Sequence, residues 1–257
     1  MSRLPRMDPD PDGERRRIAR ERLARRSPWT PRRLLRTLAL WVLGALLLGI
    51  ASVALFGRVN PPLSAFMLGE WGSAVLEGRR DFRLRHAWRP LRDISPAAAR
   101  AVIAAEDQKF LAHHGFDFDA IGSALAEREA GGRLRGASTI SQQVAKNLYL
   151  WRGRQWVRKG LEAWFTLWIE ILWSKQRILE VYLNVAQFGP GLYGVEAASQ
   201  AYFGHDAGRL DVSEAALLAA VLPNPEALNV AAPSAYLRQR QAWIVRQMRN
   251  VSSRLPP

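Results

Sequence analysis

A mainly α-helical domain behind a single transmembrane helix is the fold class that this sequence predicts. Residues 37–57 contain no charged side chain over 21 positions. From Ser95 onward apolar residues recur at helical spacing almost throughout, and no run alternates convincingly like a strand. A chain of 257 residues is long enough for one compact domain with appendages.

The composition narrows the classes of function. There is no cysteine, which excludes structural disulfides, thiolate metal sites and cysteine nucleophiles. Residues 1–36 hold 12 Arg against 5 acidic residues, and therefore carry half of the formal charge of +14. We expect this tail to set membrane topology and to contact anionic lipid, so the charge does not indicate a nucleic-acid partner.

The uncharged run at 37–57 matches the roughly 20 apolar residues that cross a bilayer as a helix. The arginines before it predict a cytoplasmic N-terminus and place the chain after Arg58 on the far side. A buried core helix and a cleaved signal peptide are the alternatives. A leader of 36 residues is unusual for a signal peptide.

Beyond the membrane the chain predicts a connector and one helical domain. Asn60-Pro61-Pro62 breaks any helix, and the apolar residues 63–71 suit either the lipid surface or a core. Helices are expected at 97–112, 119–130, 140–150, 155–173, 175–182, 194–202, 213–221 and 234–251. The expected organisation is a cytoplasmic tail (1–36), a transmembrane helix (37–57), a membrane-proximal connector (58–94) and a catalytic domain (95–252).

The first segment that could carry chemistry is residues 106–115. If the preceding helix continues, Glu106, Phe110 and His113 fall on one face. A carboxylate after an apolar run would have a raised pKa, which suits a general base. A surface acid at a frayed helix end is the alternative.

The second segment is a basic, glycine-rich loop that leads into a helix at about residue 140. Thr139 followed by Gln142 fits a capping box. Exposed amides at a helix N-terminus beside arginines suit phosphate. An ordinary capped helix after a flexible loop is the alternative.

The third segment combines cations with tryptophans. Lys146, Arg154, Arg158 and Lys159 precede Glu162 and a stretch with three tryptophans. This pattern suits a pyrophosphate with a lipid tail, or alternatively a tryptophan-rich core with a solvated basic edge.

In order along the chain, five motifs resemble glycosyltransferase family 51, the peptidoglycan glycosyltransferases, and in particular its monofunctional membrane-anchored members. They are E-D-x-x-F-x-x-H-x-G at 106–115, G-x-S-T-I-x-Q-Q at 136–143, R-K-x-x-E at 158–162, K-x-x-I-L-E-x-Y-L-N at 175–184, and the G-V-x-x-A-A-like segment at 194–198. No S-x-x-K motif of a penicillin-binding transpeptidase occurs, which favours the monofunctional type.

The resemblance implies a lysozyme-like helical head with a smaller membrane-proximal jaw, acting on lipid II. It implies that Glu106 is the catalytic base, that Glu162 is the second carboxylate of the cleft, and that Lys146 and Arg154 hold the donor pyrophosphate. The further substrate-binding residues expected from the motifs are Asp107, Ser138, Thr139, Gln142, Gln143, Arg158 and Lys159.

The same resemblance implies a single-pass protein of the inner membrane with a periplasmic catalytic domain. Its partners would be lipid II, the growing glycan chain, membrane lipid and cell-wall synthesis proteins, with no nucleic acid. No cofactor is certain, a divalent cation (Mg or Mn) is left open, and no metal ligands are assigned. A lytic lysozyme-like enzyme and a non-enzymatic basic membrane scaffold are the alternative functions.

Overall fold

The computed structural model describes residues 11–25, 31–129, 131, 138–153 and 155–251. The chain divides into two compact units, Met1–Leu48 and Gly49–Pro257. The four-part organisation expected from the sequence stays a prediction.

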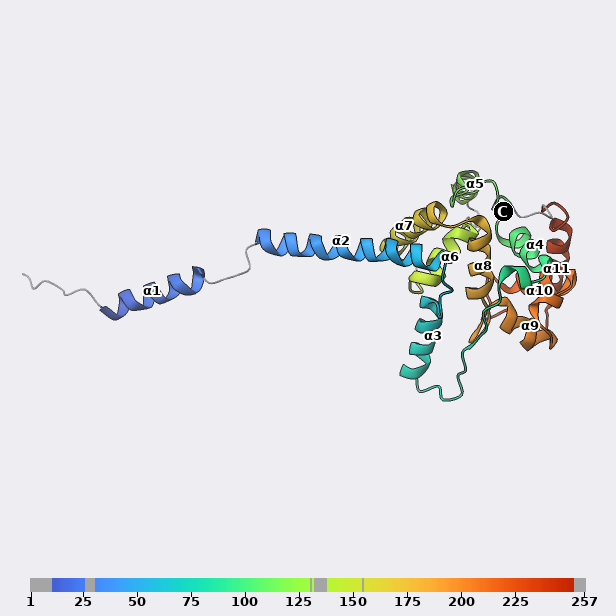
Figure 1. Ribbon diagram of the computed structural model, residues 1–257, viewed down its shortest axis with the longest axis horizontal. Helices are drawn as coiled ribbons and strands as arrows, with labels where there is room; N and C mark the ends of the chain where they lie inside the picture. The colour runs from blue at the N-terminus through green and yellow to red at the C-terminus, as the bar shows by residue number, and fades with distance from the viewer. Residues whose placement is uncertain (1–10, 26–30, 130, 132–137, 154, 252–257) are drawn as a thin grey trace, which may run out of the picture. The chain divides into compact units, whose positions relative to one another are not determined.

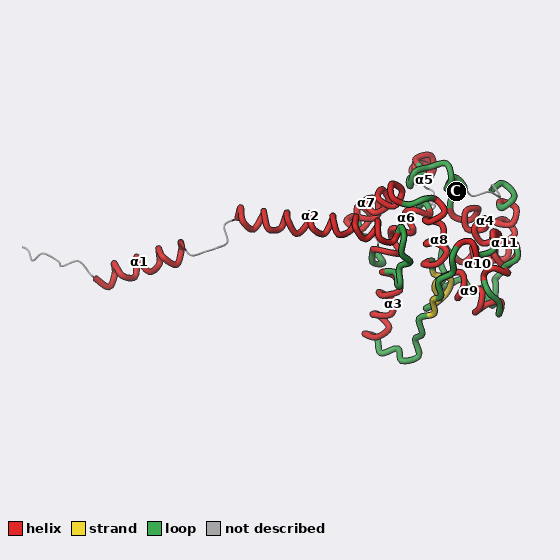
Figure 2. The backbone as a smooth tube through the Cα atoms, viewed as in Figure 1, coloured by secondary structure: helices red, strands yellow, loops and turns green. Residues whose placement is uncertain are grey.

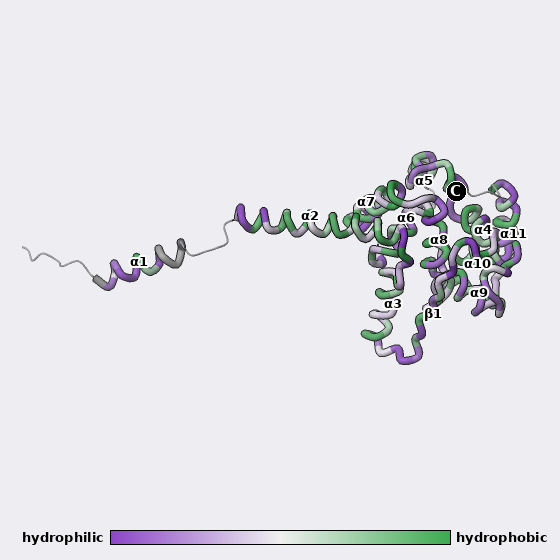
Figure 3. Tube along the Cα trace, viewed as in Figure 1, coloured by the Kyte–Doolittle hydropathy of each residue, from purple (hydrophilic) through white to green (hydrophobic). Residues whose placement is uncertain are grey.

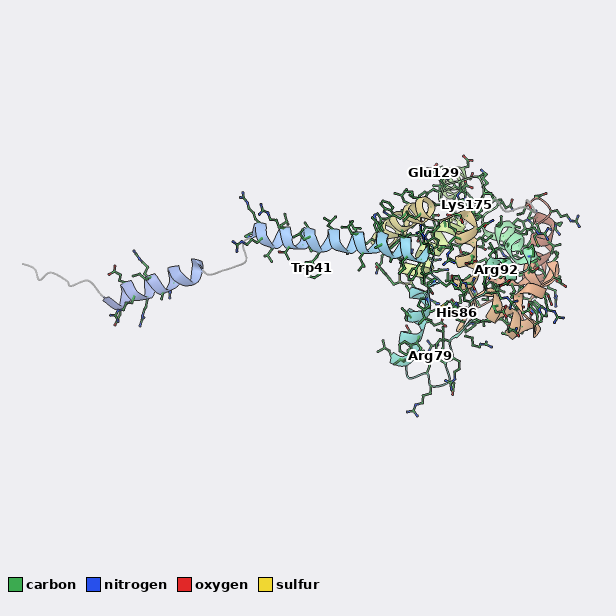
Figure 4. The ribbon with its side chains drawn as sticks, viewed as in Figure 1. Trp41, Arg79, His86, Arg92, Glu129 and Lys175 are labelled. Carbon is green, nitrogen blue, oxygen red and sulfur yellow. The ribbon has the colours of Figure 1, made fainter. Side chains whose placement is uncertain are left out.

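The helices α1 (Pro11–Arg25) and α2 (Pro31–Phe56) lead the chain. Figure 3 shows hydrophobic residues along most of α2 after a hydrophilic start. Its large apolar side chains are exposed, and Trp41, which is 75% exposed, projects from the ribbon (Figure 4). The helix is long and apolar enough to cross a membrane. An apolar helix with an exposed surface is what a membrane anchor requires, and a core helix would be buried.

The second unit is mainly helical, as Figure 2 shows, and the predicted fold class is confirmed. Its helices are α3 (Ala65–Leu76), α4 (Pro96–Glu106), α5 (Phe118–Glu129), α6 (Ile140–Tyr149), α7 (Trp156–Leu172), α8 (Lys175–Val185), α9 (Val195–Phe203), α10 (Val212–Val221) and α11 (Ala235–Gln247). Short 3-10 turns lie at Leu91–Asp93 and Ala207–Arg209. In Figure 1, α3 and the segment after it project from the cluster of helices.

Two groups of helices form the body of this unit. In one, α4 packs against α10 and α11, and in the other, α6 packs against α7 and α8. Their apolar faces share one core that contains Ile103, Ile140, Ile178 and Leu179, each at most 1% exposed. Burying one such side chain stabilises the fold by about 1.5 to 3 kcal/mol. The candidate site lies where the two groups meet, because α4 and α6 both contribute to it.

Three short strands were not predicted. β1 (Arg85–His86) pairs in parallel with β3 (Leu192–Tyr193), which pairs antiparallel with β2 (Gln187–Gly189). Strands of two or three residues are too short to show alternation in a sequence. Gly191, at φ +64°, forms the turn between β2 and β3, and a Cβ there would lie 2.7 Å from the carbonyl oxygen of Arg83.

The predicted helix at 97–112 starts as expected but is wrong beyond Glu106. Ser95 caps the helix with Pro96 at its first position, as the sequence predicted. The chain leaves the helix at Asp107, which has φ −160°. The Asp107 carboxylate accepts a hydrogen bond from the backbone N–H of Ile140, 33 residues later. A long-range contact of this kind is invisible to local periodicity. The other predicted helices are confirmed, with small shifts at their ends.

The last turns of α2 belong to the second unit and are held by two side chains. The indole Nε1 of Trp173 donates to the carbonyl of Val53 at 2.7 Å, and Arg177 Nη2 donates to the carbonyl of Phe56 at 2.8 Å. The helix end would otherwise leave orphan carbonyl groups. Trp173 is 6% exposed and therefore lies in the core, whereas Trp164 and Trp168 of the same segment are partly exposed.

Candidate active site

Glu106 ends α4 with its side chain 13% exposed. Gln143 Nε2 donates to its Oε2 at 3.0 Å, and Arg240 Nη2 lies 3.4 Å from its Oε1. Burial raises the pKa of Glu106, while Gln143, Arg240 and Lys146 offset part of the rise. The raised pKa agrees with the sequence-based expectation and suits a general base, because a more basic carboxylate accepts a proton more readily.

The amide of Gln143 is held in one orientation by a second hydrogen bond. The hydroxyl of Tyr182 on α8 donates to Gln143 Oε1 at 3.1 Å, so the amide nitrogen faces Glu106. Burial holds the pKa of Tyr182 well above its usual range, so this hydroxyl stays protonated and acts as a donor. A chain of two hydrogen bonds therefore connects α8 through α6 to Glu106 on α4.

Asp107 is buried and connects α4 to the start of α6. Its carboxylate accepts from His113 Nε2 at 2.9 Å and from the backbone N–H of Ile140 at 2.9 Å. An acidic side chain is favourable at a helix N-terminus because it faces the positive end of the helix dipole. These contacts fix the backbone next to Glu106. In the described structure the backbone N–H of Ile140 is used by the carboxylate of Asp107, and so is not left exposed for a phosphate as the sequence had suggested.

The capping box at the start of α6 is confirmed. Thr139 accepts from the backbone N–H of Gln142, and the Gln142 side chain accepts from the N–H of Thr139. Thr139 Oγ1 also donates to the carbonyl of Gly115 at 2.7 Å. The polar groups of Thr139 and Gln142 are therefore used in local hydrogen bonds. Ser138 lines a cavity that Glu106 and Thr139 also line. The substrate-binding role expected for these three residues stays a prediction, and residues 132–137 of the same loop lie outside the described residues.

The basic cluster forms around Glu162 on α7. Arg158 Nη1 lies 2.8 Å from Glu162 Oε2, and Lys159 pairs with the other oxygen, Oε1. Lys146 on α6 faces this group, and burial lowers its pKa while the charges of Glu162 and Glu106 oppose that change. The side chain of Lys146 thus lies in the field of both carboxylates. Arg154, the other cation assigned to the pyrophosphate, lies outside the described residues.

Two cavities flank the pair formed by Glu106 and Gln143. One, of about 250 Å³, is lined by Glu106, Asp107, Gln108, Lys109, Asp117, Ala120, Ser138 and Thr139. The other, of about 210 Å³, is lined by Phe66, Gln143, Lys146, Asn147, Arg152, Tyr182, Ala186, Gln187, Leu222, Pro223, Asn224, Pro225 and Glu226. Glu106 lines the first cavity, where it can accept a proton from a bound group, and its hydrogen-bond partner Gln143 lines the second.

The sequence did not indicate that Arg240 and Tyr182 lie beside Glu106 and Gln143. Tyr182 lies inside one of the five motifs, which was the available signal, although the motif assigns it no contact. Arg240 on α11 is 134 positions from Glu106, and nothing local distinguishes it from the arginines around it. Among the residues that the structure describes, no three side chains of histidine, aspartate or glutamate gather as metal ligands.

Comparison with known proteins gives the class of enzyme. Residues 74–249, which include the residues of the site, match the transglycosylase family. The chain belongs to the transglycosylase family. It is 52% identical over 225 residues to the biosynthetic peptidoglycan transglycosylase of Xanthomonas campestris pv. campestris (strain B100), covering 86% of this chain and 91% of that protein.

Two further relatives carry the same description. The protein of Xylella fastidiosa (strain 9a5c) is 52% identical over 222 residues, covering 86% of this chain and 89% of the relative. The protein of Salmonella paratyphi B (strain ATCC BAA-1250 / SPB7) is 57% identical over 223 residues, covering 86% and 92%. The similarity therefore extends over nearly the full length of these proteins.

Proposed function

We propose that the chain polymerises lipid II into peptidoglycan glycan strands by inverting glycosyl transfer, with release of undecaprenyl pyrophosphate and with Glu106 as general base. Membership of the transglycosylase family supports the reaction class. The observation that carries the assignment of the base is Glu106 itself, a largely buried carboxylate with a raised pKa that lines one cavity and accepts a hydrogen bond from Gln143, which lines the other.

In the proposed step the 4-hydroxyl oxygen of the acceptor sugar attacks the anomeric carbon of the donor. The new C–O bond forms as the bond from that carbon to the pyrophosphate oxygen breaks. The hydroxyl proton passes to the Glu106 carboxylate, because a sugar hydroxyl is too weak an acid to ionise at neutral pH. Attack from the face opposite the pyrophosphate inverts the anomeric centre.

The leaving pyrophosphate needs cations more than it needs a general acid, because it already leaves as a stable anion. Lys146, Lys159 and Arg158 supply positive charge on the Gln143 side of Glu106. Glu162 accepts from both Arg158 and Lys159, so we assign it the role of holding these cations in place. We assign Arg154 to the donor pyrophosphate as well, on the resemblance of its sequence segment alone.

We further propose that α2 is a single anchor in the inner membrane, with a cytoplasmic N-terminus and a periplasmic catalytic domain. The arginine-rich tail before α2 supports this orientation. Membrane lipid and the cell-wall synthesis proteins are the partners that this location implies.

The test is polymer formation by the purified full-length protein. Labelled lipid II in detergent should be converted into long products that a muramidase degrades. The assay should be repeated over several detergents and with Mg²⁺, Mn²⁺ or a chelator. If no polymer forms under any of these conditions, the proposed function is wrong.

A further inference from the structure

Arg240 is held against Glu106 in a way that the motifs do not explain. It lies on α11, which packs against α4, and its guanidinium reaches Oε1 of Glu106 at 3.4 Å. Its side chain is 21% exposed, so water screens the pair only partly. The contact therefore joins the C-terminal helix to the candidate catalytic base.

Among the residues that the structure describes, Glu106 is the one ion-pair partner of the Arg240 guanidinium. Within the described part of the chain, its Nε is buried without a hydrogen-bond partner, and its ion pair is with Glu106. The ion pair with Glu106 is made through Nη2, so the position of the guanidinium is set by this carboxylate.

The two oxygens of Glu106 have different partners on opposite helices. Gln143 on α6 donates to Oε2 at 3.0 Å, and Arg240 on α11 approaches Oε1 at 3.4 Å. Two contacts from two elements fix the plane of a carboxylate, which one contact cannot do.

We propose that Arg240 is a positioning residue of the site: its guanidinium holds Oε1 of Glu106 opposite the amide of Gln143 and places a positive charge beside the carboxylate. This inference rests on the proposed function, in which Glu106 acts as an ionised base. Arg240 acts through Glu106 and is assigned no contact with substrate.

Other groups also act on the charge of Glu106. Lys146 on α6 favours the ionised form, whereas the neighbouring Asp107 opposes it. Tyr182 on α8 stays protonated and acts only through Gln143. The residues of α10 buried beside α4 are apolar. With Arg240 removed, burial of Glu106 would be opposed mainly by Gln143 and Lys146, so the pKa of Glu106 rises further.

The experiment compares the pH dependence of kcat in the full-length enzyme and three variants. In Arg240→Met, kcat at neutral pH should fall about tenfold, with little change in KM, because the base is less often ionised. The acid limb of the profile should move to higher pH, and the loss should shrink in alkaline buffer. Arg240→Lys keeps the charge and should hold the acid limb near that of the parent. Arg238→Met, which removes an exposed arginine from the same helix, should match the parent.

A purely structural role for Arg240 predicts a different result. An acid limb at the parent's pH, or an equal loss of kcat at every pH, would overturn the inference. If Arg240→Met does not fold, the neutral Arg240→Gln must show the same displacement of the acid limb. A parent enzyme that makes no polymer contradicts the proposed function, whereas an active parent with an unmoved limb in the variants contradicts this inference alone.

Discussion

Replacing Glu106 by glutamine removes the proton acceptor while keeping the size of the side chain. The amide oxygen can still accept from Gln143, whose 3.0 Å contact with Glu106 fixes its place. A positioned general base contributes about a hundredfold to ten-thousandfold in rate, or about 2.7 to 5.5 kcal/mol of activation free energy. We therefore expect kcat of Glu106→Gln to fall by at least about a hundredfold.

The effect of Glu106→Gln on stability should be small and should depend on pH. The variant loses an ion pair with Arg240 at 3.4 Å but also removes a buried charge, so the free energy of unfolding should stay within about 1 kcal/mol of the parent. Burial raises the pKa of Glu106, so its protonated form is favoured in the folded state. Its contribution to stability is therefore full below the unfolded pKa and is lost as the pH rises through the folded pKa.

Two measurements on one preparation test this reasoning. Relative to the parent, Glu106→Gln should gain in melting temperature as the pH rises, while parent activity should fall on the acid side as Glu106 protonates. Glu129→Gln is the matched control, because Glu129 is exposed on α5 (Figure 4) and should change neither quantity. A folded Glu106→Gln enzyme that made polymer at more than about a tenth of the parent rate would remove Glu106 from the mechanism.

Three further predictions concern the surroundings of the base. Lys146→Ala should lower kcat/KM about tenfold to a hundredfold, because it removes a charge-assisted contact of about 1.5 to 3 kcal/mol, whereas Arg92→Ala, which removes one exposed charge, should not. Full turnover of the Lys146 variant would refute the assignment to pyrophosphate. Tyr182→Phe should lower the free energy of unfolding by about 1 to 3 kcal/mol and lower kcat, because the amide that contacts the base loses its anchor. A variant with parent kcat would show that this orientation is unimportant. A reporter that is active only outside the cytoplasm, fused after Pro257, should be active. Activity of a cytoplasmic reporter instead would reverse the proposed topology.

The sequence was sufficient where a structure depends on neighbouring residues. Ser95 with Pro96, and Thr139 with Gln142, mark two helix starts because caps act over two or three positions. The amphipathic repeat located most of the remaining helices for the same reason.

Features set by distant residues could not be predicted in this way. The end of α4 depends on a contact between Asp107 and the backbone of Ile140. Arg240 meets Glu106 only because α11 packs on α4. Both contacts join residues far apart in the chain, and periodicity carries no information about them.

The two cavities beside the Glu106–Gln143 pair differ in charge, and on the proposed function this difference orients the donor and the acceptor. One is lined by three carboxylates and a single lysine, and the other by Lys146 and Arg152 with the single carboxylate of Glu226. On the proposed function, the departing pyrophosphate of the donor is favoured beside the cations of the second cavity, and the uncharged 4-hydroxyl end of the acceptor fits the first. The charge difference therefore orients the reacting ends of the two sugars about Glu106 and Gln143.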